Sequence, residues 1–490
     1  MTPLRTSVVI LGSGFGGSLL ALVLERVGIS CAVIERGAHP RFAIGESSTP
    51  MADLLLETFA ENYDMEWLRP FAHFGSWQES YPEINCGCKR GFSYFHHQRK
   101  DPSKFSDPSE LLVSASVDRH SADTHWHRGD FDTDLVQRLV DQGIPYFDQT
   151  KIQYITSAPH WLIEGQRHGK TVKVAAEFLI DATGGDPQLA SHLELRTDQN
   201  MRTNSYALFG HFRQVQTWTS VLEANRRETS HHPMPADDAA LHHVFDGGWL
   251  YALRFRDGIT SAGLCVQGGG WLQRQIEQQR DPKLAWDQAL SNFPSIQAQF
   301  ESATLETELF RTARLQRQVH RATGDRWALL PHAAGFVDPL HSTGIAHTLL
   351  SVERLVEALR ERGPRRATLL QGYDDALRRE RALVDVLVHG SYASFHSFPV
   401  FSSFAMLYFA AAHFSEQQRR AGLPTGFLNA DDSRFVSVVH SHHQALLAAG
   451  VQARSHEFGL RFSESVAQSI APWNLAGLAD PKKRNMYACL

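Results

Sequence analysis

The sequence has few cysteines, no excess of basic residues and no long hydrophobic run. Its cysteines are too few and too scattered for a disulfide framework, which predicts a reducing, cytoplasmic environment; they are Cys31, Cys86, Cys88, Cys265 and Cys489. Lys and Arg total 48 against 53 for Asp and Glu, so the basic surplus typical of nucleic-acid-binding proteins is absent. The most apolar later stretch, Phe404–Phe414, is about half as long as a membrane-spanning helix, and no signal peptide precedes the first apolar segment. We therefore expect a soluble intracellular protein that binds neither nucleic acid nor membranes.

The first forty residues carry a dinucleotide-binding pattern. Ser7–Leu11 is typical of a buried parallel strand, and Ser18–Val27 is an apolar stretch typical of a helix. Between them lies Gly12-Ser-Gly14-Phe15-Gly-Gly17, whose glycines permit a tight turn, a close approach to a pyrophosphate and close helix packing. A second strand, Ser30–Ile34, ends at Glu35, where a carboxylate can bind ribose hydroxyls. No second copy of the pattern is present, so we predict one dinucleotide and no separate nicotinamide domain.

Two later segments also pass from an apolar strand into a polar loop. Glu177–Ile180 leads into Asp181-Ala-Thr-Gly184. Trp327–Leu330 leads towards Asp338-Pro339-Leu-His341-Ser-Thr343-Gly344, which is followed by an apolar helix, Ala346–Leu359. The glycine turn alone does not separate FAD from NAD. Members of the flavoprotein monooxygenase superfamily hold FAD with an early glycine turn and a late loop and helix. The order of these segments along this chain resembles that superfamily.

Several sequence motifs point to one family within this superfamily. In chain order they are His39-Pro-Arg41-Phe, Gly45-Glu46-Ser47-Ser-Thr-Pro, Cys88-Lys89-Arg-Gly91-Phe92, Arg128-Gly-Asp-Phe-Asp and the late loop from Asp338 to Gly344. In this order, residues 1–365 resemble the flavin-dependent halogenases, and among these the stand-alone halogenases of small phenols, such as the phloroglucinol halogenases of pseudomonads. The resemblance weakens towards the C-terminus.

The resemblance implies a fold and a reaction. The fold is α/β (α+β), with a three-layer Rossmann-like FAD-binding domain, an antiparallel substrate-binding sheet and a helical C-terminal region. Hypohalous acid is made at the flavin from FADH2, O2 and chloride or bromide. It then crosses a tunnel to Lys89, which occupies the lysine position of the family's K-x-G motif and halogenates an electron-rich, phenol-like substrate. A separate NAD(P)H-dependent flavin reductase supplies FADH2, and a homodimer is compatible with this scheme. An FAD-dependent aromatic monooxygenase that hydroxylates or epoxidises a similar substrate is the alternative.

The family motifs assign expected roles to single positions. Cofactor contacts are expected from Gly12, Gly14, Phe15, Gly17, Glu35, Arg41, Glu46, Ser47, Arg128, Asp181, Gly184, Asp338, Pro339, Gly344 and Ile345. The halide is expected at Thr343 and Gly344, where the N–H groups and positive dipole of a helix start can hold an anion. Trp249, Tyr251 and Phe92 are expected in the substrate pocket. Lys89 and His341 are the candidate catalytic residues, and no metal site is expected.

Three departures from the family pattern matter. Trp249-Leu-Tyr251-Ala-Leu253-Arg254 stands where halogenases have W-x-W-x-I-P, a motif that keeps the substrate from the flavin, so the monooxygenase alternative stays open. Pro331-His332 replaces the Gly-Asp that precedes the late loop in the superfamily. His341 stands where tryptophan halogenases have glutamate, which argues against tryptophan as substrate. With an unperturbed pKa near ~6.5, this imidazole is either a proton acceptor or a local hydrogen-bonding group.

Most of these residues also have a purely structural explanation. Most lysines are solvated, although the apolar positions that follow Lys89 favour a strand with a buried face. Arg90 is expected on the opposite face of that strand. Alternation alone predicts that Trp249, Tyr251 and Leu253 are buried, and Ser342 or Thr343 can serve as an ordinary helix N-cap.

Two further groups invite functional interpretations that we consider weaker than structural ones. Aromatic residues at helical spacing, from Tyr392 to Phe409, are more often core than a substrate lid. Adjacent histidines make poor joint metal ligands because neighbouring side chains diverge; these pairs are His96-His97, His231-His232, His242-His243 and His442-His443. Cys86 and Cys88, without a second pair, are expected to be buried thiols.

The length of 490 residues and a hydrophobic content of 42% predict two or three domains. An FAD-binding domain is expected from residues 1–50, 105–195 and 320–365, and a substrate-binding domain from residues 51–104 and 196–319. Residues 366–490 are expected to form the helical C-terminal region. Helices are also predicted at Met51–Asn62, Asp130–Gln142 and Asp281–Asn292.

Overall fold

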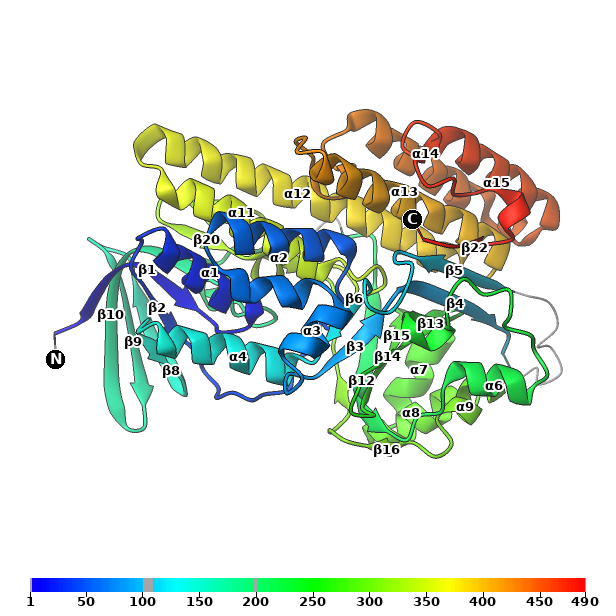
Figure 1. Cartoon of the computed structure of the whole chain (residues 1–490), viewed down its shortest axis with the longest axis horizontal. Coiled ribbons are helices and arrows are strands. Elements are labelled where there is room, and N and C mark those ends of the chain that lie inside the picture. Colours follow the sequence, from blue (N-terminus) through cyan, green and yellow to red (C-terminus); the bar gives the residue numbers. More distant parts are fainter. Residues whose placement is uncertain (1, 100–108, 198–200, 490) are drawn as a thin grey trace.

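The computed structural model describes residues 2–99, 109–197 and 201–489. Within these ranges the chain forms two large sheets side by side, with helices packed along them (Figure 1). The long helix α12 (Gly363–Ser394) runs along the top of both halves in this view, and the C-terminal helices lie beside its second half. The mixed α/β fold therefore agrees with the expected class.

In the part of the chain that the structure describes, the first sheet has eight strands and contains the nucleotide-binding pattern. β1 (Leu4–Leu11) lies between β2 (Cys31–Ile34) and β10 (Lys170–Asp181), parallel to both. β20 (Trp327–Leu329) is parallel to β10 on its other side. The remaining strands are β7 (Tyr146–Phe147), β8 (Thr150–Thr156), β9 (Trp161–Arg167) and β19 (Thr323–Gly324). Because parallel strands end at one edge, the glycine turn, Glu35 and Asp181 are brought together there.

Two elements of this half are longer than the pattern predicts. β10 begins at Lys170 rather than Glu177, because its first half is partly exposed and pairs with β9 in a hairpin, which removes the hydrophobic signal. α1 (Phe15–Arg26) begins directly after Gly14, which occupies the N-cap, so the helix starts before the apolar run does. The helix buries ten consecutive residues, from Phe15 to Leu24. It contacts α4 (Arg128–Asp141) and α11 (Gly344–Arg360), and α11 also contacts α2 (Pro50–Asn62).

The second sheet has nine strands within the described ranges and is mainly antiparallel, as expected. Its central strands are β12 (Ser205–Arg213), β13 (Ala240–Phe245), β14 (Gly248–Arg254) and β15 (Thr260–Gln267). The others are β4 (Gly91–His97), β5 (Glu110–Ser114), β16 (Thr304–Leu305), β17 (Phe310–Arg311) and β22 (Met486–Tyr487). β4 joins β13 in parallel, and β22, from the far C-terminus, joins β5 in parallel.

The expected boundary between residues 104 and 105 lies outside the described residues. β5 pairs with β4 rather than with the nucleotide-binding sheet. We propose to keep the three-part division, with residues 110–114 counted with the second sheet. A three-stranded sheet also forms from β11 (Arg196–Thr197), β18 (Arg317–Val319) and β21 (Gly335–Phe336) among the described residues.

A small two-stranded sheet positions Lys89. β3 (Cys86–Lys89) pairs antiparallel with β6 (Asp123–Trp126), and Lys89 lies opposite Asp123. All eight residues of the two strands are buried. α3 (Phe74–Ser80) packs on β3. The predicted buried strand around Lys89 is thus two strands, β3 and β4, separated by Arg90.

The predicted helices are present with small differences at their ends. Met51–Asn62 corresponds to α2, Asp130–Gln142 to α4, and Asp281–Asn292 to α8 (Pro282–Leu290), whose N-cap Asp281 accepts from the N–H groups of Lys283 and Leu284. The shorter helices are α5 (Gln188–His192), α6 (Trp218–Ala224), α7 (Trp271–Gln278), α9 (Pro294–Gln299) and α10 (Pro331–Ala334).

The C-terminal region is helical, and its aromatic run forms core. Its helices are α12, α13 (Phe398–Arg420), α14 (Ser433–Ala449) and α15 (His456–Ile470). Among the described residues, α13 is the one helix long and apolar enough to cross a membrane, but 83% of its most apolar window is buried inside the protein. The aromatic side chains from Tyr392 to Phe409 are each at most 7% exposed. This favours the core interpretation over a mobile lid.

Candidate active site

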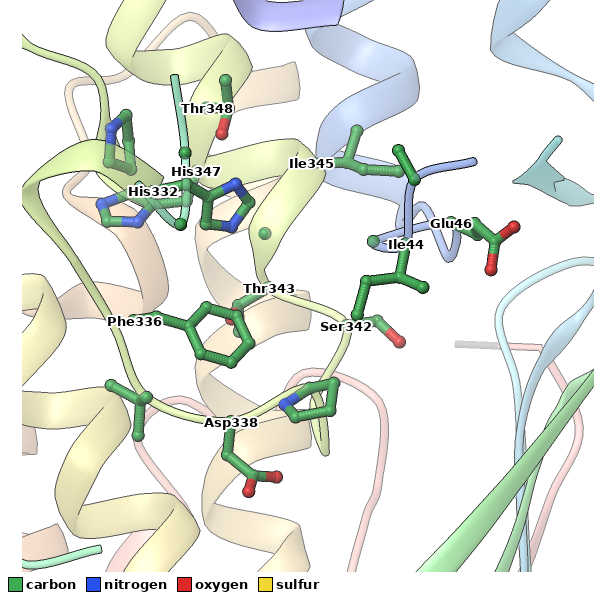
Figure 2. Close-up of a pocket in the computed structure, with 18 of the residues that line it drawn as sticks. Ile44, Glu46, His332, Phe336, Asp338, Ser342, Thr343, Ile345, His347 and Thr348 are labelled. Atoms are coloured by element: carbon green, nitrogen blue, oxygen red, sulfur yellow. The ribbon is translucent and has the colours of Figure 1, made fainter. Parts of the chain in front are cut away.

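A cavity of about 450 Å³ lies where the nucleotide-binding edge of the first sheet meets the second sheet. Figure 2 shows His332 and Phe336, followed by the late loop at Asp338 and Thr343, along one side of it. Ile44 and Glu46, on a separate segment, lie next to Ile345 and Ser342. The glycine turn, Arg41, Arg128 and the loop Ala182–Gly185 also line the cavity, and Trp249, Tyr251 and Leu253 reach it from β14. Segments that the resemblance assigned to one cofactor therefore share one cavity.

The glycine turn has no room for side chains at two of its positions. Gly12 has a φ of +99°, and a Cβ there would lie 2.7 Å from the carbonyl oxygen of Ala182. A Cβ on Gly17 would lie 2.1 Å from the carbonyl oxygen of Gly12. At Gly14 the space is larger, and the guanidinium groups of Arg41 and Arg128 lie 3.6 and 3.5 Å from the Cβ position. Two guanidinium groups and the Asp132 carboxylate, 3.7 Å away, therefore surround the open side of the turn.

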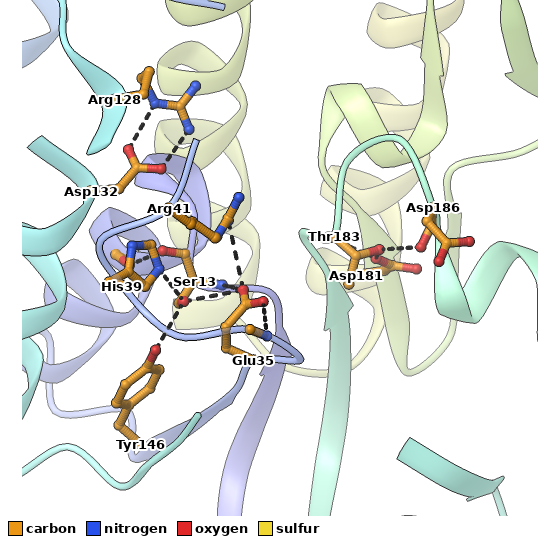
Figure 3. Close-up of polar contacts among 12 residues, drawn as sticks. Ser13, Glu35, His39, Arg41, Arg128, Asp132, Tyr146, Asp181, Thr183 and Asp186 are labelled. Carbon is orange, nitrogen blue, oxygen red and sulfur yellow. Dashed lines mark hydrogen bonds and ion pairs between the residues drawn. The ribbon is translucent and has the colours of Figure 1, made fainter. Parts of the chain in front are cut away.

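Glu35, at the end of β2, is held by the turn itself (Figure 3). Its Oε2 accepts from the N–H of Ser13 at 2.9 Å and from the Ser13 hydroxyl at 3.2 Å, and its Oε1 accepts from the N–H of Gly37 at 2.8 Å. Burial opposes ionisation, but these N–H groups and the Arg41 guanidinium lower the pKa of Glu35. The carboxylate therefore stays charged, although Glu35 is not among the residues that line the cavity. Sequence reasoning missed Ser13, which also contacts His39 at 2.9 Å.

Arg128, at the start of α4, joins two segments of the site. It donates to both oxygens of Asp132, at 2.8 and 2.7 Å, and to the carbonyl oxygens of Ile44 and Gly45 at 3.0 and 3.3 Å. Both ionic side chains are buried, so this bidentate pair is shielded from solvent. The i,i+4 spacing of Arg128 and Asp132 on a helix is a signal that could have identified the partner.

Glu46 and Ser47 connect the early loop to other elements. The imidazole of His211 lies 2.8 Å from Glu46 Oε1, in a buried contact. Ser342 donates its hydroxyl to Ser47 Oγ at 3.0 Å, which ties the early loop to the late loop. The segment Glu46–Ser47 is therefore attached both to β12 of the second sheet and to the late loop.

Asp181, at the end of β10, is satisfied by its own loop (Figure 3). Its oxygens accept from the N–H and hydroxyl of Thr183, at 3.0 and 2.5 Å, and from the N–H of Leu189 at 2.7 Å. Burial raises its pKa, while these hydrogen bonds oppose that rise. Asp181 thus orients the loop Ala182–Gly185, and Gly184, with a φ of +71°, lines the cavity.

The residues of this edge fit a dinucleotide. Glu35 suits ribose hydroxyls, and Arg41 and Arg128 place positive charge beside the turn where a pyrophosphate would lie. Arg41 Nε and His39 Nδ1 are buried without a hydrogen-bond partner among the described groups, as expected for a site that binds a polar ligand. The opposite end is more apolar and includes Phe336, Pro339 and Ile345. Its His332 is neutral, because burial, with Arg317 nearby, lowers its pKa to about 3.

The late loop leads into α11 without a side-chain cap. Thr343 is the N-cap residue, and its side chain makes no capping hydrogen bond. Ser342 has a φ of +51° and uses its hydroxyl on Ser47 instead, so the expected ordinary capping by these hydroxyls is not observed. Thr343, Gly344 and Ile345 all line the cavity. The helix start therefore faces the cavity with its dipole's positive end.

Asp338 is a buried carboxyl group that faces the second sheet and α12. Its Oδ2 accepts from Ser205 at 2.6 Å and from Tyr392 at 3.0 Å, and its Oδ1 accepts from the N–H of Leu340 at 3.2 Å. Burial raises its pKa to about 6, although these donors oppose the rise. Asp338 and Pro339 both line the cavity, as expected for the late loop.

Lys89 is fully buried behind the cavity lining. Its side chain is 0% exposed, and its Nζ donates to the carbonyl oxygen of Ser48 and lies 4.2 Å from the centre of the Phe92 ring. Ser47 and His242 line the cavity next to it. Burial lowers the pKa of Lys89 to about 8, although nearby carboxylates oppose the shift. Arg90 points away and donates to the carbonyl oxygens of Ser116 and Val117, as its position on the other face predicts.

The expected substrate-pocket residues are only partly together. Trp249 and Tyr251 line the cavity, and both are buried on one face of β14 with Leu253. Phe92 lies behind His242, on whose ring it stacks at 5.8 Å between centroids. The aromatic groups around Phe92 are Tyr94, Tyr408 and Phe409. The aromatic region therefore extends from the cavity lining towards Lys89.

His341 makes local contacts in the interior. Its ring stacks on Tyr408 at 4.3 Å between centroids, and its Nε2 lies 3.5 Å from the hydroxyl of Ser391. Burial lowers its pKa to about 3, so its imidazole is a weak proton acceptor. The geometry favours the local hydrogen-bonding interpretation of this residue.

One histidine pair converges in spite of its adjacent positions. His231 and His232 both approach Glu110, with distances of 2.8 and 3.4 Å to its oxygens. The potential ligand atoms of the three residues lie within 4.8 Å of one another. The argument that neighbouring side chains diverge does not hold here, because the pair lies on a turn rather than on a helix or strand. Cys86 and Cys88 are buried free thiols, as expected.

No protein-family model matches the chain. The monodechloroaminopyrrolnitrin halogenase PrnC of Pseudomonas fluorescens is 28% identical over 411 residues, which are 82% of this chain and 70% of that enzyme. The tetracycline 7-halogenase of Kitasatospora aureofaciens is 27% identical over 419 residues, which are 83% of this chain and 73% of that enzyme. The crystal structure of halogenase PltM with phloroglucinol and FAD has the same fold, with a TM-score of 0.86, 23% identity and coverage of 99% of this chain and 100% of that one. Together with the motif order and the cavity that gathers those motifs, these similarities show that the chain is an enzyme of the flavin-dependent halogenase family.

Proposed function

We propose that this enzyme uses FADH2, O2 and chloride or bromide to halogenate an electron-rich, phenol-like aromatic substrate, and that Lys89 directs the halogen to the ring. One observation supports this most strongly. Lys89 is fully buried between the cavity lining and a group of aromatic side chains, instead of lying on the surface where most lysines lie. Burying an amine costs free energy, so the burial of Lys89 favours a functional role for it.

The chain's own residues can hold the cofactor and the halide. Glu35, Arg41 and Arg128 would bind the ribose and pyrophosphate, and the apolar end of the late loop would contact the ring system. When bound, reduced FAD supplies the two electrons with which O2 and halide give hypohalous acid. The start of α11 at Thr343 and Gly344 would hold the halide, because its N–H groups and dipole attract an anion.

Lys89 would bind hypohalous acid and orient it. With a pKa lowered to about 8, the amine exchanges protons readily near neutral pH, yet stays largely protonated there. The ammonium can donate a hydrogen bond to the oxygen of hypohalous acid, whereas the neutral amine could accept the halogen as a haloamine. The surrounding aromatic groups exclude water and so protect the oxidant from side reactions.

A phenol-like substrate fits the chemistry of the surroundings. On the side of Lys89 that faces the cavity lining, Phe92 lies against the amine and His242 is neutral, since burial lowers the pKa of His242 to about 3. An electrophilic halogen reacts with electron-rich rings, and a hydroxyl group supplies that electron density. The PltM structure contains phloroglucinol, a phenol, in a protein of the same fold. We also propose a separate flavin reductase as the source of FADH2 and a cytoplasmic location, which the small number of cysteines supports.

A hydroxylating or epoxidising monooxygenase is the second candidate, because the motif that keeps substrate from flavin is altered. Tyr251 replaces a tryptophan, and its ring lies 5.9 Å from that of Trp249. Arg254 replaces a proline and donates to the carbonyl oxygens of Val215 and Gln216 at 3.0 and 3.2 Å. Arg254 thus anchors the end of β14, so the strand keeps its position without the proline.

The test uses the purified enzyme with a flavin reductase, NADH, halide and a panel of phenols, followed by mass spectrometry. We expect halogen isotope patterns with the native enzyme. In Lys89→Ala, flavin oxidation should continue while halogenated product disappears. Lys151→Ala, at an exposed position of β8, is the matched control and should behave like the native enzyme. A product heavier by one oxygen atom without halide, retained in Lys89→Ala, would instead establish the monooxygenase.

A further inference from the structure

Lys89 lies near three buried carboxyl groups that its role as a halogen carrier does not require. Asp53 on α2, Asp123 on β6 and Glu416 on α13 are 2%, 4% and 8% exposed. Asp123 is directly opposite Lys89 in the β3–β6 pairing. Both oxygens of Asp53 and Oδ2 of Asp123 accept no hydrogen bond from a donor among the described residues. Burying carboxyl oxygens without donors is costly, so their presence needs an explanation.

Asp53 and Asp123 contact each other through their carboxyl groups. Two buried carboxyl groups in contact cannot both ionise, so the pair holds a proton. Burial, reinforced by Asp123, raises the pKa of Asp53 well above its ordinary value, and burial also raises the pKa of Asp123. Burial raises the pKa of Glu416 to about 8. Near neutral pH this carboxyl cluster, consisting of Asp53, Asp123 and Glu416, therefore keeps at least one proton beside Lys89.

Among the described residues, the charged groups that act on the Lys89 amine are those of the carboxyl cluster. The electrostatic neighbours of the Lys89 amine within the described chain are the carboxyl cluster and two histidines, His125 on β6 and His242 on β13. Burial lowers the pKa of each histidine to about 3, so both are neutral. Burial also keeps Tyr408, which interacts with Glu416 and Asp123, in its neutral form. Proton exchange with Lys89 is thus left to the carboxyl cluster.

Two partly exposed titratable groups act electrostatically on the carboxyl cluster. Asp53 interacts with Glu57, one turn further along α2, and Asp123 interacts with His73 and Arg420. His73 Nε2 lies 3.4 Å from Glu57 Oε1, and these two side chains are 38% and 35% exposed. His73 and Glu57 are therefore candidate entry points for protons that reach the buried cluster.

We propose that the Asp53–Asp123 pair, assisted by Glu416, returns a proton to Lys89 in each catalytic cycle. This inference rests on the role proposed above for Lys89. As the halogen passes to the ring carbon, the oxygen–halogen bond breaks and the carbon–halogen bond forms. The departing oxygen takes a proton from the Lys89 ammonium and leaves as water. The ring carbon then loses its own proton to the water molecule so formed, which carries it to solvent, and the C–H electron pair restores aromaticity. Lys89 recovers a proton from the Asp53–Asp123 pair, which is refilled from solvent through Glu57 and His73, so protons balance.

The pH dependence of halogenation tests this proposal. Asp123→Asn, Asp53→Asn and Glu416→Gln each remove a carboxyl group that favours the charged form of Lys89. In the first two variants the shared proton is also gone, so Lys89 is reprotonated more slowly where protons in solution are scarce. The alkaline limb of the halogenation rate should therefore move to lower pH by about one unit, which lowers the rate there about tenfold. The Glu416→Gln shift should have the same direction and be smaller. Flavin oxidation, measured in the same samples, should keep its native rate at each pH.

Controls separate this role from a structural one. Asp374→Asn removes another buried carboxyl group, bonded to the N–H of Ala322 on the far side of the nucleotide-binding half, and should leave the pH profile in place. A rate lowered equally at every pH, or an unmoved alkaline limb, would overturn the proposal. Asp variants that halogenate faster than the native enzyme on the acidic side of the profile would show that the neutral amine is the active form. That result would also overturn the proposal.

Two further measurements complete the design. If the Asp variants fail to fold, halogenation by the native enzyme in D2O still tests the proposal. The halogenation rate should be lower in D2O than in H2O, while the rate of flavin oxidation should not change. Equal halogenation rates in the two solvents would contradict proton return by this route. Halogenation that survives in Lys89→Ala would refute the proposed function of Lys89 itself. Loss of halogenation in Lys89→Ala combined with unmoved pH profiles in the Asp variants would refute only the carboxyl cluster's role.

Discussion

Trp249 donates its indole N–H to the hydroxyl of Tyr392 at 2.9 Å. Tyr392 in turn donates to Oδ2 of Asp338 at 3.0 Å. One chain of hydrogen bonds thus joins β14 of the second sheet, helix α12 and the late loop, and all three side chains are buried. In such a low-dielectric interior each of these bonds is stronger than on the surface, so the chain helps to fix the late loop against the cavity.

Tyr392→Phe should therefore destabilise the enzyme. It leaves the Trp249 N–H without its acceptor and removes one donor from Asp338, which should lower the free energy of unfolding by about 2 kcal/mol. Urea denaturation measures this directly. The double variant Trp249→Phe with Tyr392→Phe should lose less than the sum of the two single variants, because the unsatisfied N–H is then gone. Strict additivity would show that the two side chains are not coupled.

The glycine turn was predictable from the sequence because its requirements are local. Gly17 meets the carbonyl oxygen of Gly12 in the same turn, and the strand–turn–helix pattern already implies this. The contact of Gly12 with Ala182, after β10, depends instead on the pairing of the strands. The buried position of Lys89 was also indicated by the alternation that follows it. For Gly17 and Lys89 the neighbours in the sequence determine the environment.

The carboxyl cluster was not predictable in the same way. Asp53, Asp123 and Glu416 belong to three elements that are far apart in the chain, and each looks like an ordinary charged residue of an amphipathic segment. Only tertiary packing places them together and away from solvent. The same holds for β22, which completes the second sheet with residues from the end of a helical region. Long-range pairing of short elements leaves no periodic signal in the sequence.

Gly17→Ala should abolish cofactor binding. The added Cβ would lie 2.1 Å from the carbonyl oxygen of Gly12, so the turn and α1 would have to separate. Gly372→Ala is the matched control, because this glycine lies within α12 and a Cβ there meets no atom within 4 Å. That control should raise stability by about 0.5–1 kcal/mol, as alanine favours helix. Flavin fluorescence on titration measures binding, and tight binding by Gly17→Ala would contradict the described turn.

Stability should fall steeply as the pH drops below about 6.5. Burial lowers the pKa of His125, His242, His243, His332 and His341 to about 3 each. Above their unfolded pKa near ~6.5 these groups are neutral in both states and add no pH dependence. Below it the unfolded chain binds protons that the folded chain does not, until the pH reaches the folded values. Between pH 7 and pH 6 the five histidines together should lower the free energy of unfolding by about 3 kcal/mol.

Thermal unfolding across pH 5 to 8 checks this expectation, together with the protons taken up on unfolding near pH 5.5. His168→Gln, at an exposed position of a turn, should leave the slope as it is. His243→Asn should make it shallower, because one group that resists protonation in the folded state is removed. A stability that stays constant from pH 7 to 5 would show that these histidines are protonated in the native protein.

Gly344→Ala should weaken halide binding more than it weakens cofactor binding. An added Cβ would lie 2.8 Å from Nε2 of the half-buried His332, so the first turn of α11 would have to move away from the cavity. If the N–H groups at this helix start hold the halide, the half-saturating halide concentration should rise about tenfold, a loss of about 1.4 kcal/mol. Thr343→Val should have a smaller effect, since it removes a hydroxyl that makes no capping bond and leaves the backbone in place. Halogenation rates measured over a range of bromide and chloride concentrations distinguish the two variants. A larger effect of Thr343→Val than of Gly344→Ala would assign the halide to the threonine hydroxyl instead of the helix start.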